Sequence, residues 1–574
     1  MGFVTSALQI GRNAILANQG ALQIVGNNVA NAANPDYTRQ TAGLTALEGT
    51  SLPGGLQPGA GVALTQLKRN LDEALEGRLR DALGNRESLT TQQSNLARLE
   101  SLFNDVGGQG VGAQITDFFN KFSDVQNQPS DRGIRAVAIA SGTGLAASLT
   151  RLRNDLIALG NDADSQIGVL VKQADQTAGQ IADLNARILA AEAGGQGPAS
   201  ALRDQRDALL RDLSQLADVT VRTQSDGTIN VYLGNEPLVL GGTSRGLTTK
   251  TTSDGQFTRT SILFADTGSQ VVPRSGRLAG LMATRDQQAF ARIEAVDRLA
   301  RAIINDVNRI HADGQGLIGF SSLTGTYAVD DPTASLSSAG LPFAPTSGSF
   351  FIAVTNQATG LTRAYQINVD LDGTAPDTTL ASLASDINTN VTGITATVTA
   401  GNRLSLTAAD GLTFSFGNDG VTARSDTSGV LAALGLNTCF DGSSAADIRV
   451  NPALQQDPAR LAAARVNFAG DGTNAGRLAG LANAASTLLS GSSISEGYQA
   501  ITNDVAVTSG AAREAADASD TALSALQAQK ESISGVSLDE EAINLLKYER
   551  AFQGAARYVT TVDRTLNELM SLLS

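Results

Sequence analysis

The chain has 574 residues, of which 42% are hydrophobic, so it can form three or four domains with sizeable cores. Its net charge is −14 and its basic residues form no run, which argues against binding to nucleic acid or to an anionic membrane surface. No apolar run approaches the roughly 20 residues that span a bilayer, and the single cysteine, Cys439, excludes an internal disulfide.

The first predicted helix covers Val4 to Asn31 and carries apolar residues at a spacing of seven. Such a spacing predicts a seam that packs against a partner helix. The helix is expected to end in the polar run before Pro35, because proline disfavours helical geometry in the residue that precedes it. The predicted N-terminal seam consists of Val4, Leu8, Ile15, Leu22, Val25 and Val29.

A helical bundle domain is predicted over residues 66–217. It follows a Gly/Pro/Ser-rich stretch, Gly43 to Gly61, that predicts a loop. A long helical region is expected to begin after Pro129, with Ser130 or Asp131 as its N-cap. The other expected features are helices over Gln66–Phe103 and Ile115–Gln126, a break at Gly107–Gly112, and a corner at Gly194–Pro198 before the region ends at Leu216.

At Val219 the apolar period switches from helical to two. Alternating runs flank the turn sequence Ser225–Thr228, which predicts a β-hairpin within an excursion over residues 218–275. The segment Leu278–His311 is helical again, so residues 276–320 are expected to return to the bundle.

A small outer α+β domain is predicted over residues 321–450, with its pattern concentrated between Leu341 and Phe440. The expected order is two strands, the helix Leu380–Val391, and a second hairpin that joins Leu404–Leu406 to Leu412–Phe416. Residues 451–533 are expected to lead back through helices.

The last predicted helix, in residues 534–574, carries a second seam. Ser537 is the expected N-cap, and Asp539 to Glu541 suit the positive end of the helix dipole, although Glu541 interrupts the seam. One seam alone is typical of an ordinary bundle helix, but a seam at each end of the chain favours assembly. The C-terminal seam consists of Leu538, Leu545, Tyr548, Phe552, Val559, Val562, Leu566, Leu569 and Leu573.

Four features that could suggest chemistry have simpler interpretations, so we expect no catalytic residue, cofactor or metal. His311 is the only histidine and lies near a helix end, and the GxGxxG match at Gly314–Gly319 follows a helix rather than a strand. The acidic run Asn368–Gly373 lacks the final glutamate of an EF-hand and is expected to be a hairpin turn. Cys439 has no partner cysteine.

Both ends of the chain resemble the bacterial flagellar rod, hook and hook-associated protein family. Residues 27–40 are similar to the N-terminal motif of that family, with Asp36 where glycine is usual, and residues 534–552 are similar to its C-terminal motif. The matching N-terminal residues are Asn27, Asn28, Asn31, Asn34, Pro35, Tyr37, Arg39 and Gln40.

The resemblance implies an elongated, mainly α axial protein with terminal coiled-coil helices, a helical bundle and β-rich insertions. It would be an extracellular, non-catalytic adaptor ring between hook and filament, exported by the flagellar type III apparatus. The implied partners are copies of itself, the hook protein, a second junction protein toward the filament, and a cytosolic export chaperone on the C-terminal helix. Alternatives are a hook or distal rod protein, or a surface enzyme or adhesin carried by the β insert.

Overall fold

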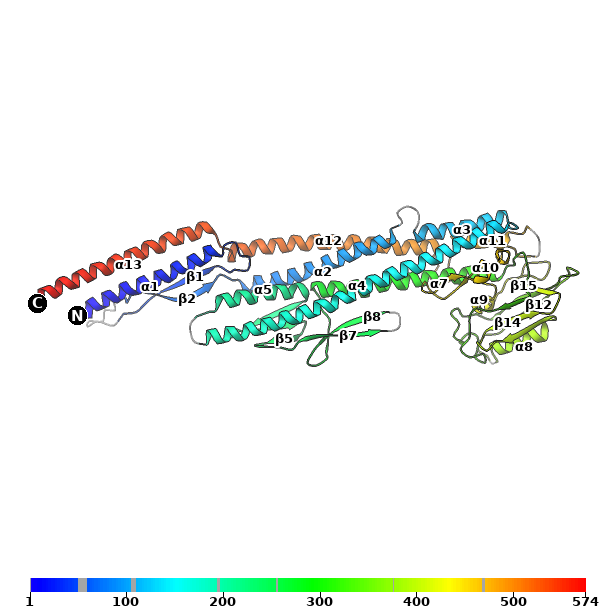
Figure 1. Ribbon diagram of the computed structural model, residues 1–574, viewed down its shortest axis with the longest axis horizontal. Coiled ribbons are helices and arrows are strands. Elements are labelled where there is room, and N and C mark those ends of the chain that lie inside the picture. Colours follow the sequence, from blue (N-terminus) through cyan, green and yellow to red (C-terminus); the bar gives the residue numbers. More distant parts are fainter. Residues whose placement is uncertain are drawn as a thin grey trace. The chain divides into compact units, whose positions relative to one another are not determined.

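The computed structural model describes residues 2–49, 59–104, 110–193, 197–253, 257–374, 376–466 and 470–573 (Figure 1). Most of this part is helical and the strands form several small sheets, so the prediction of a mainly α fold with β-rich insertions is confirmed. The chain forms two compact units. Unit 1 comprises Met1–Ser94, Asp162–Thr284 and Ala511–Ser574, and unit 2 comprises Asn95–Asn161 and Arg285–Gly510. None of the described helices has the length and apolar character needed to cross a membrane.

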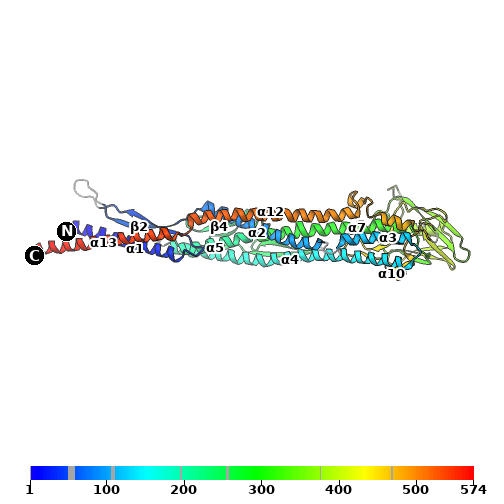
Figure 2. The same cartoon turned by 90° about the horizontal axis from the view of Figure 1, so that it is seen from above.

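Helices α1 (Gly2–Ala30) and α13 (Leu538–Leu573) lie side by side and antiparallel in unit 1, as Figures 1 and 2 both show. A β-hairpin of β1 (Gln40–Ala46) and β2 (Val62–Arg69) packs against α1. The expected loop from Gly43 and helix from Gln66 are therefore wrong where they overlap these strands. The hairpin depends on a tertiary contact, because Leu64 lies so close to Gly20 that a Cβ there would be 2.7 Å from Leu64 Cδ2.

The bundle helices are α2 (Glu73–Phe103), α3 (Val111–Asn127), α4 (Arg132–Glu192), α5 (Ser200–Leu216), α6 (Gly276–Ala283), α7 (Phe290–Ala312) and α12 (Ile494–Ser534). Helices α3, α4 and α6 begin close to the expected positions, whereas α2 and α12 begin later than expected. Asp131 caps α4, since its Oδ1 accepts hydrogen bonds from the backbone N–H groups of Gly133 (2.7 Å) and Ile134 (3.1 Å). The first half of the predicted break at Gly107–Gly112, and the first part of the predicted corner at Gly194, lie outside the described residues.

The excursion after α5 contains two sheets, and the predicted hairpin is part of the first. The first has the order β3 (Val219–Thr223), β4 (Ile229–Leu233), β5 (Glu236–Leu240), β6 (Thr243–Ser244), and the second β7 (Leu247–Ser253), β8 (Thr258–Phe264), β9 (Gln270–Val271). The predicted β3–β4 hairpin is present, and Gly227 in its turn has φ +82°. Val231 and Ile262 share one core with Leu213 of α5 and Leu278 of α6.

The outer insert in unit 2 contains two sheets and the helix α8 (Leu380–Asn390). One sheet has the order β12 (Thr362–Val369), β11 (Gly348–Asn356), β15 (Leu412–Phe416), and the other β10 (Ser322–Thr324), β14 (Leu404–Ala408), β13 (Ile394–Val398). The predicted β14–β15 hairpin is wrong, because these neighbouring strands enter different sheets. Phe414 of β15 pairs with Val354 of β11, and this pairing places it in the insert core beside Phe320.

The insert core runs from Ala312 to Leu436 and includes the short helix α9 (Val430–Ala433). The chain then forms β16 (Phe440–Asp441), β17 (Arg449–Val450), α10 (Pro452–Gln456), a 3-10 turn at Pro458–Arg460, α11 (Thr473–Gly480) and a 3-10 turn at Thr487–Leu489. The return to the bundle over residues 451–533 thus contains the helices α10, α11 and α12, but short elements make up most of it until α12 begins at Ile494.

Candidate assembly site at the chain termini

Helix α13 packs on α1 through the middle of its predicted seam. Tyr548, Phe552, Ala555, Val559, Val562 and Leu566 are half-buried at alternating spacings of four and three residues along this helix. The ends of the seam behave differently: Leu538, Leu545 and Leu569 are 58%, 43% and 46% exposed. The side chain of Leu573 lies outside the described part of the chain.

On α1 the deeply buried row is not the row of large apolar residues. Leu8, Ile15 and Leu22 are half-buried and Val29 is 44% exposed, whereas Val25 is buried as predicted. The side chain of Val4 is not among those described. The buried row also contains small and polar residues, namely Gly11, Ala17, Asn18, Ala21 and Asn28.

Close approach of the two helices explains this difference. A Cβ at Gly11 would overlap Val559 Cγ2 of α13, so only glycine allows the helices to approach this closely there. The large apolar residues of α1, which defined the predicted seam, therefore lie beside the row that contains Gly11, where α1 comes closest to α13.

The side chain of Asn28 joins the end of α1 to the segment that follows it. Its Oδ1 accepts hydrogen bonds from Tyr37 Oη (2.7 Å) and the Gln40 backbone N–H (3.0 Å). Its Nδ2 donates to the Gln40 carbonyl (2.9 Å) and to Glu541 Oε2 (3.1 Å). Asn28 is only 1% exposed, and these bonds use both donors and both acceptor positions of its amide.

Arg39 connects the same segment to the first turn of α13. Its Nη2 lies 2.8 Å from Glu541 Oε1 and its Nη1 lies 2.6 Å from Glu540 Oε2. Glu541 is 1% exposed, so a buried carboxylate is neutralised by a guanidinium and bonded to an amide. We call Asn28, Tyr37, Arg39, Gln40, Glu540 and Glu541 the terminal clasp.

The charges in the terminal clasp are mutually stabilised. Burial alone would lower the pKa of Arg39, but its bonds to Glu541 and Glu540 outweigh burial and raise it. Burial, together with the nearby charges of Asp204 and Glu541, raises the pKa of Tyr37 to about 12. Tyr37 therefore stays protonated at neutral pH, and its hydroxyl donates a hydrogen bond to Asn28 Oδ1.

Sequence reasoning missed Glu541 as a site residue, because it assigned this residue to the acidic first turn of the helix and to an interruption of the seam. The signal was present, since a carboxylate at a core heptad position needs a buried cation or hydrogen-bond donors. The motif at the other end of the chain supplies both in Arg39 and Asn28.

The remaining motif residues shape the turn after α1. Asn31 Nδ2 donates to the Asn27 carbonyl (2.9 Å), and Asn34 Oδ1 accepts from the backbone N–H of Asp36 (3.1 Å). The Pro35 carbonyl accepts from Lys530 Nζ of α12 (3.4 Å).

Asp36, which stands where glycine is usual in the resembling motif, has its own partner. Its Oδ1 lies 2.6 Å from Arg211 Nη2 on α5. The substitution is therefore accompanied by an ion pair within unit 1.

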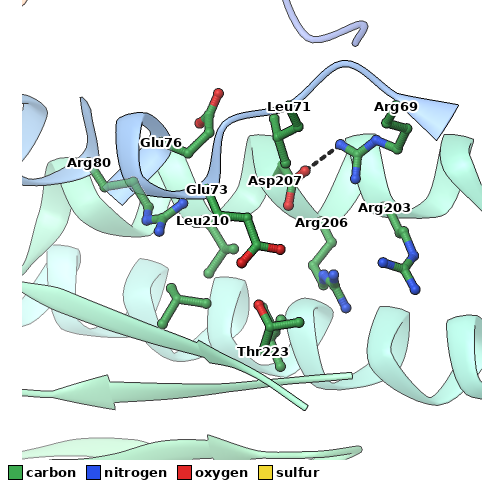
Figure 3. Close-up of a pocket in the computed structure, with 12 residues that line it drawn as sticks. Arg69, Leu71, Glu73, Glu76, Arg80, Arg203, Arg206, Asp207, Leu210 and Thr223 are labelled. Carbon is green, nitrogen blue, oxygen red and sulfur yellow. Dashed lines mark hydrogen bonds and ion pairs between the residues drawn. The ribbon is translucent and has the colours of Figure 1, made fainter. Parts of the chain in front are cut away.

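Arg69, at the end of β2, ties the β1–β2 hairpin to α5. Its Nη2 lies 2.6 Å from Asp204 Oδ1 and 2.5 Å from Asp207 Oδ2. Figure 3 shows that Arg69 and Asp207 line a pocket of about 100 Å³ together with Glu73 and Arg80 of α2. The pocket contains both signs of charge, which makes it part of the ion-pair network that holds the hairpin.

His311 is a structural residue of unit 2. It is fully buried, its Nδ1 lies 2.7 Å from the Asn437 carbonyl, and its Nε2 accepts from the Ala462 backbone N–H (3.0 Å). Burial lowers its pKa to about 4, against a smaller opposing contribution from the bond to Asn437. A neutral imidazole that donates through Nδ1 and accepts through Nε2 satisfies both contacts.

The other features with possible chemistry are also local structure. Cys439 is 2% exposed, and burial raises its pKa to about 12, which keeps it a thiol. Gly314–Gly319 follows α7, as expected. The Asn368–Gly373 run is not a hairpin turn, because it connects the end of β12 toward α8. The Asp372 carboxylate there accepts from the backbone and hydroxyl of Thr374.

We expect acid to destabilise unit 2 through His311. Its pKa is lower in the folded protein than its ordinary value of 6.5, so the unfolded state binds a proton first as pH falls. Stability is therefore present above pH 6.5 and is lost toward pH 4, by about 2 kcal/mol between pH 7.5 and pH 5. Hydrogen exchange of α7, corrected for intrinsic rates, measures this loss. The His311→Gln variant should lack this component, and an equal slope in both proteins would contradict the prediction.

Comparison with known proteins adds three matches to family models. Residues 96–325 match the flagellar hook-associated protein FlgK helical domain, residues 527–572 match the flagellar basal body rod FlgEFG protein C-terminal model, and residues 352–410 match the flagellin hook IN motif. The last match lies within the outer insert.

Whole-chain relatives share the same description. Flagellar hook-associated protein 1 of Escherichia coli (strain K12) is 26% identical over 99% of this chain and 100% of its own length. The protein of that name from Bacillus subtilis (strain 168) is 23% identical over 98% of this chain and 97% of its own length. The solved structure of the flagellar hook junction protein FlgK from Burkholderia pseudomallei has a similar fold, with a TM-score of 0.50, 20% identity, and coverage of 80% of this chain and 100% of that chain.

Proposed function

We infer that this chain, a member of the flagellar hook-associated protein family, is a structural and non-catalytic subunit of the extracellular bacterial flagellum at the junction of hook and filament. Relatives described as flagellar hook-associated protein 1 match it from end to end, and this full-length similarity is the observation that carries the inference. It also favours the junction over the alternative of a hook or distal rod protein.

We propose that copies of the chain contact one another through α1 and α13 to form a ring. Large apolar side chains remain exposed on these two helices although α1 and α13 already pack together. Such an accumulation is typical of a protein–protein contact surface. The exposed residues are Leu16, Val29, Leu538, Ile543, Leu545, Leu546, Tyr558, Leu569 and Met570.

The geometry of α13 supports a second contact face. Tyr548 and Phe552 face α1, whereas Ile543 and Leu546 are 66% and 58% exposed. At 100° per residue, Ile543 and Leu546 lie on the side of α13 opposite the row that meets α1. The helix therefore has one apolar face for its own chain and another that a neighbouring copy can cover.

The other partners follow from the position at the junction. We propose that the hook protein lies on one side of the ring and a second junction protein on the other, toward the filament. We further propose export by the flagellar type III apparatus and a cytosolic chaperone that covers α13 before assembly. The exposed apolar face of α13 supports a need for such cover in the cytosol.

A substitution on the exposed face tests the ring. Ile543→Asp is expected to leave hydrogen exchange of the purified chain unchanged, because the side chain is exposed in the single subunit. It should nevertheless remove filaments from hooks when it replaces the native protein in cells, since burial of an unpaired carboxylate between copies is unfavourable. Asn567→Asp is the matched control, because Asn567 is exposed on the same helix and lies about 120° around it from Ile543.

Two outcomes contradict these proposals separately. Normal filaments with Ile543→Asp would exclude this face of α13 as a contact. Absence of the labelled native protein from the hook–filament boundary in isolated flagella would contradict the junction role itself.

A further inference from the structure

The break between α12 and α13 is three residues long and begins with a glycine that the local geometry requires. Helix α12 ends at Ser534 and α13 begins at Leu538. The Gly535 backbone N–H donates to the Glu531 carbonyl (2.9 Å), and a Cβ on Gly535 would overlap that same oxygen. The chain thus ends α12 tightly and then restarts with Ser537 as the cap of α13, through its Oγ contact with the Glu540 N–H (3.4 Å).

Arg39 contacts both sides of this break. Its backbone N–H donates to the carbonyl of Ser534, the last residue of α12, at 3.0 Å. Its guanidinium binds Glu540 and Glu541 in the first turn of α13. Ser534 is 4% exposed and Glu541 is 1% exposed, so one contact on each side of the break is shielded from water.

Packing beside the break is open. A pocket of about 190 Å³ lies between the turn after α1 and the end of α12, lined among others by Pro35, Tyr37, Glu531 and Val536. Close-packed interiors hold helices in place by interlocking side chains, and a pocket of this size leaves the break without such contacts on that side. The polar contacts of Arg39, together with the hydrogen bonds from Asn28 to Glu541 and from Lys530 to the Pro35 carbonyl, are therefore the restraints that remain.

We propose that Arg39 is a positioning residue that holds α12 and α13 in their observed arrangement across the break. A glycine inside a helix costs only about 1 kcal/mol relative to alanine, so arrangements in which the break becomes helical lie close in free energy. Docking of the segment that carries Arg39 onto the ends of α12 and α13 selects one of these arrangements. One consequence rests on the proposed function: a subunit presents the outer face of α13 correctly to its neighbour only when its own N-terminal motif is docked.

Distances between spin labels across the break test the positioning role in the purified full-length chain. Ala528→Cys on α12 and Ala551→Cys on α13 are exposed labelling sites, and the buried Cys439 does not compete for the reagent. We expect one narrow distance distribution with Arg39 present. In the Arg39→Ala variant it should become at least about twofold wider at unchanged helical content, because several arrangements are then populated.

Two further variants complete the experiment. Arg557→Ala removes an exposed arginine of α13 and should leave the distribution unchanged. Arg39→Lys keeps the charge but not the two-pronged geometry, so an intermediate width is expected.

A distribution of native width in Arg39→Ala overturns the proposal. If Arg39→Ala instead loses helical content, Arg39→Lys decides: greater width at native helical content supports the positioning role, and native width overturns it. This measurement needs no flagellum, so its failure is distinguishable from failure of the proposed function, which shows only as absence from the hook–filament boundary.

Discussion

Replacement of Glu541 by alanine is expected to release α13 from the N-terminal motif and to abolish attachment of filaments. Glu541 is 1% exposed and is bonded to both Arg39 and Asn28. Breaking a buried ion pair by removal of one partner typically costs 3–5 kcal/mol, and we expect roughly 3 kcal/mol here because Glu540 still faces Arg39. Hydrogen exchange should accelerate by about 100-fold over the first turns of α13, since 1.4 kcal/mol corresponds to a factor of ten.

The neighbouring glutamate is a matched control. Glu540 shares Arg39 as its partner, but its side chain is 60% exposed. Exposed ion pairs contribute about 1 kcal/mol or less, so Glu540→Ala should keep both the protection of α13 and filament attachment. Equal effects of the two substitutions would show that the surface pair, rather than the buried carboxylate, holds the clasp.

An acidic residue in the seam should have a similarly large effect. Phe552 is half-buried on the face of α13 that meets α1, and the only charged residue of α1 is Arg12, which is exposed. Phe552→Asp therefore places a carboxylate where no buried cation is available, at a cost of several kcal/mol. We expect the variant to be produced and to retain the folded middle of the chain, but to leave hooks without filaments.

The adjacent residue separates the effect of position from the effect of charge. Ala551 is exposed on the same helix, so Ala551→Asp adds the same carboxylate without burying it against α1. Motility at the native level with Ala551→Asp and its loss with Phe552→Asp is the expected pair of results. Swimming cells with attached filaments in the Phe552→Asp strain would exclude this part of the seam as necessary for the junction.

The local sequence pattern was sufficient to predict much of the helical part of the chain. The spacing of Tyr548, Phe552 and Val559 predicted the side of α13 that meets another helix, because residues at that spacing share one face. The N-cap at Asp131 and the turn at Gly227 could also be predicted from the sequence, because each depends on the chemistry of a few adjacent residues.

The pairing of strands and helices from distant segments could not be predicted from the local sequence in the same way. Strands β14 and β15 are separated by a short turn, yet the turn sequence does not specify which sheet each strand enters. The β1–β2 hairpin likewise depends on α1, against which Leu64 packs near Gly20. Strand propensity is decided largely by such neighbours rather than by the strand itself.

The sequence by itself determined that both ends of the chain form amphipathic helices and that a polar motif follows the first, because periodicity and turn residues act over a few positions. Only the tertiary structure decided that Glu541 belongs with Asn28 and Arg39. A carboxylate at a helical core position is unfavourable until a donor and a cation from some 500 residues away are placed beside it. The close approach of α1 and α13 at Gly11, which the lack of a side chain permits, was likewise decided by the tertiary structure.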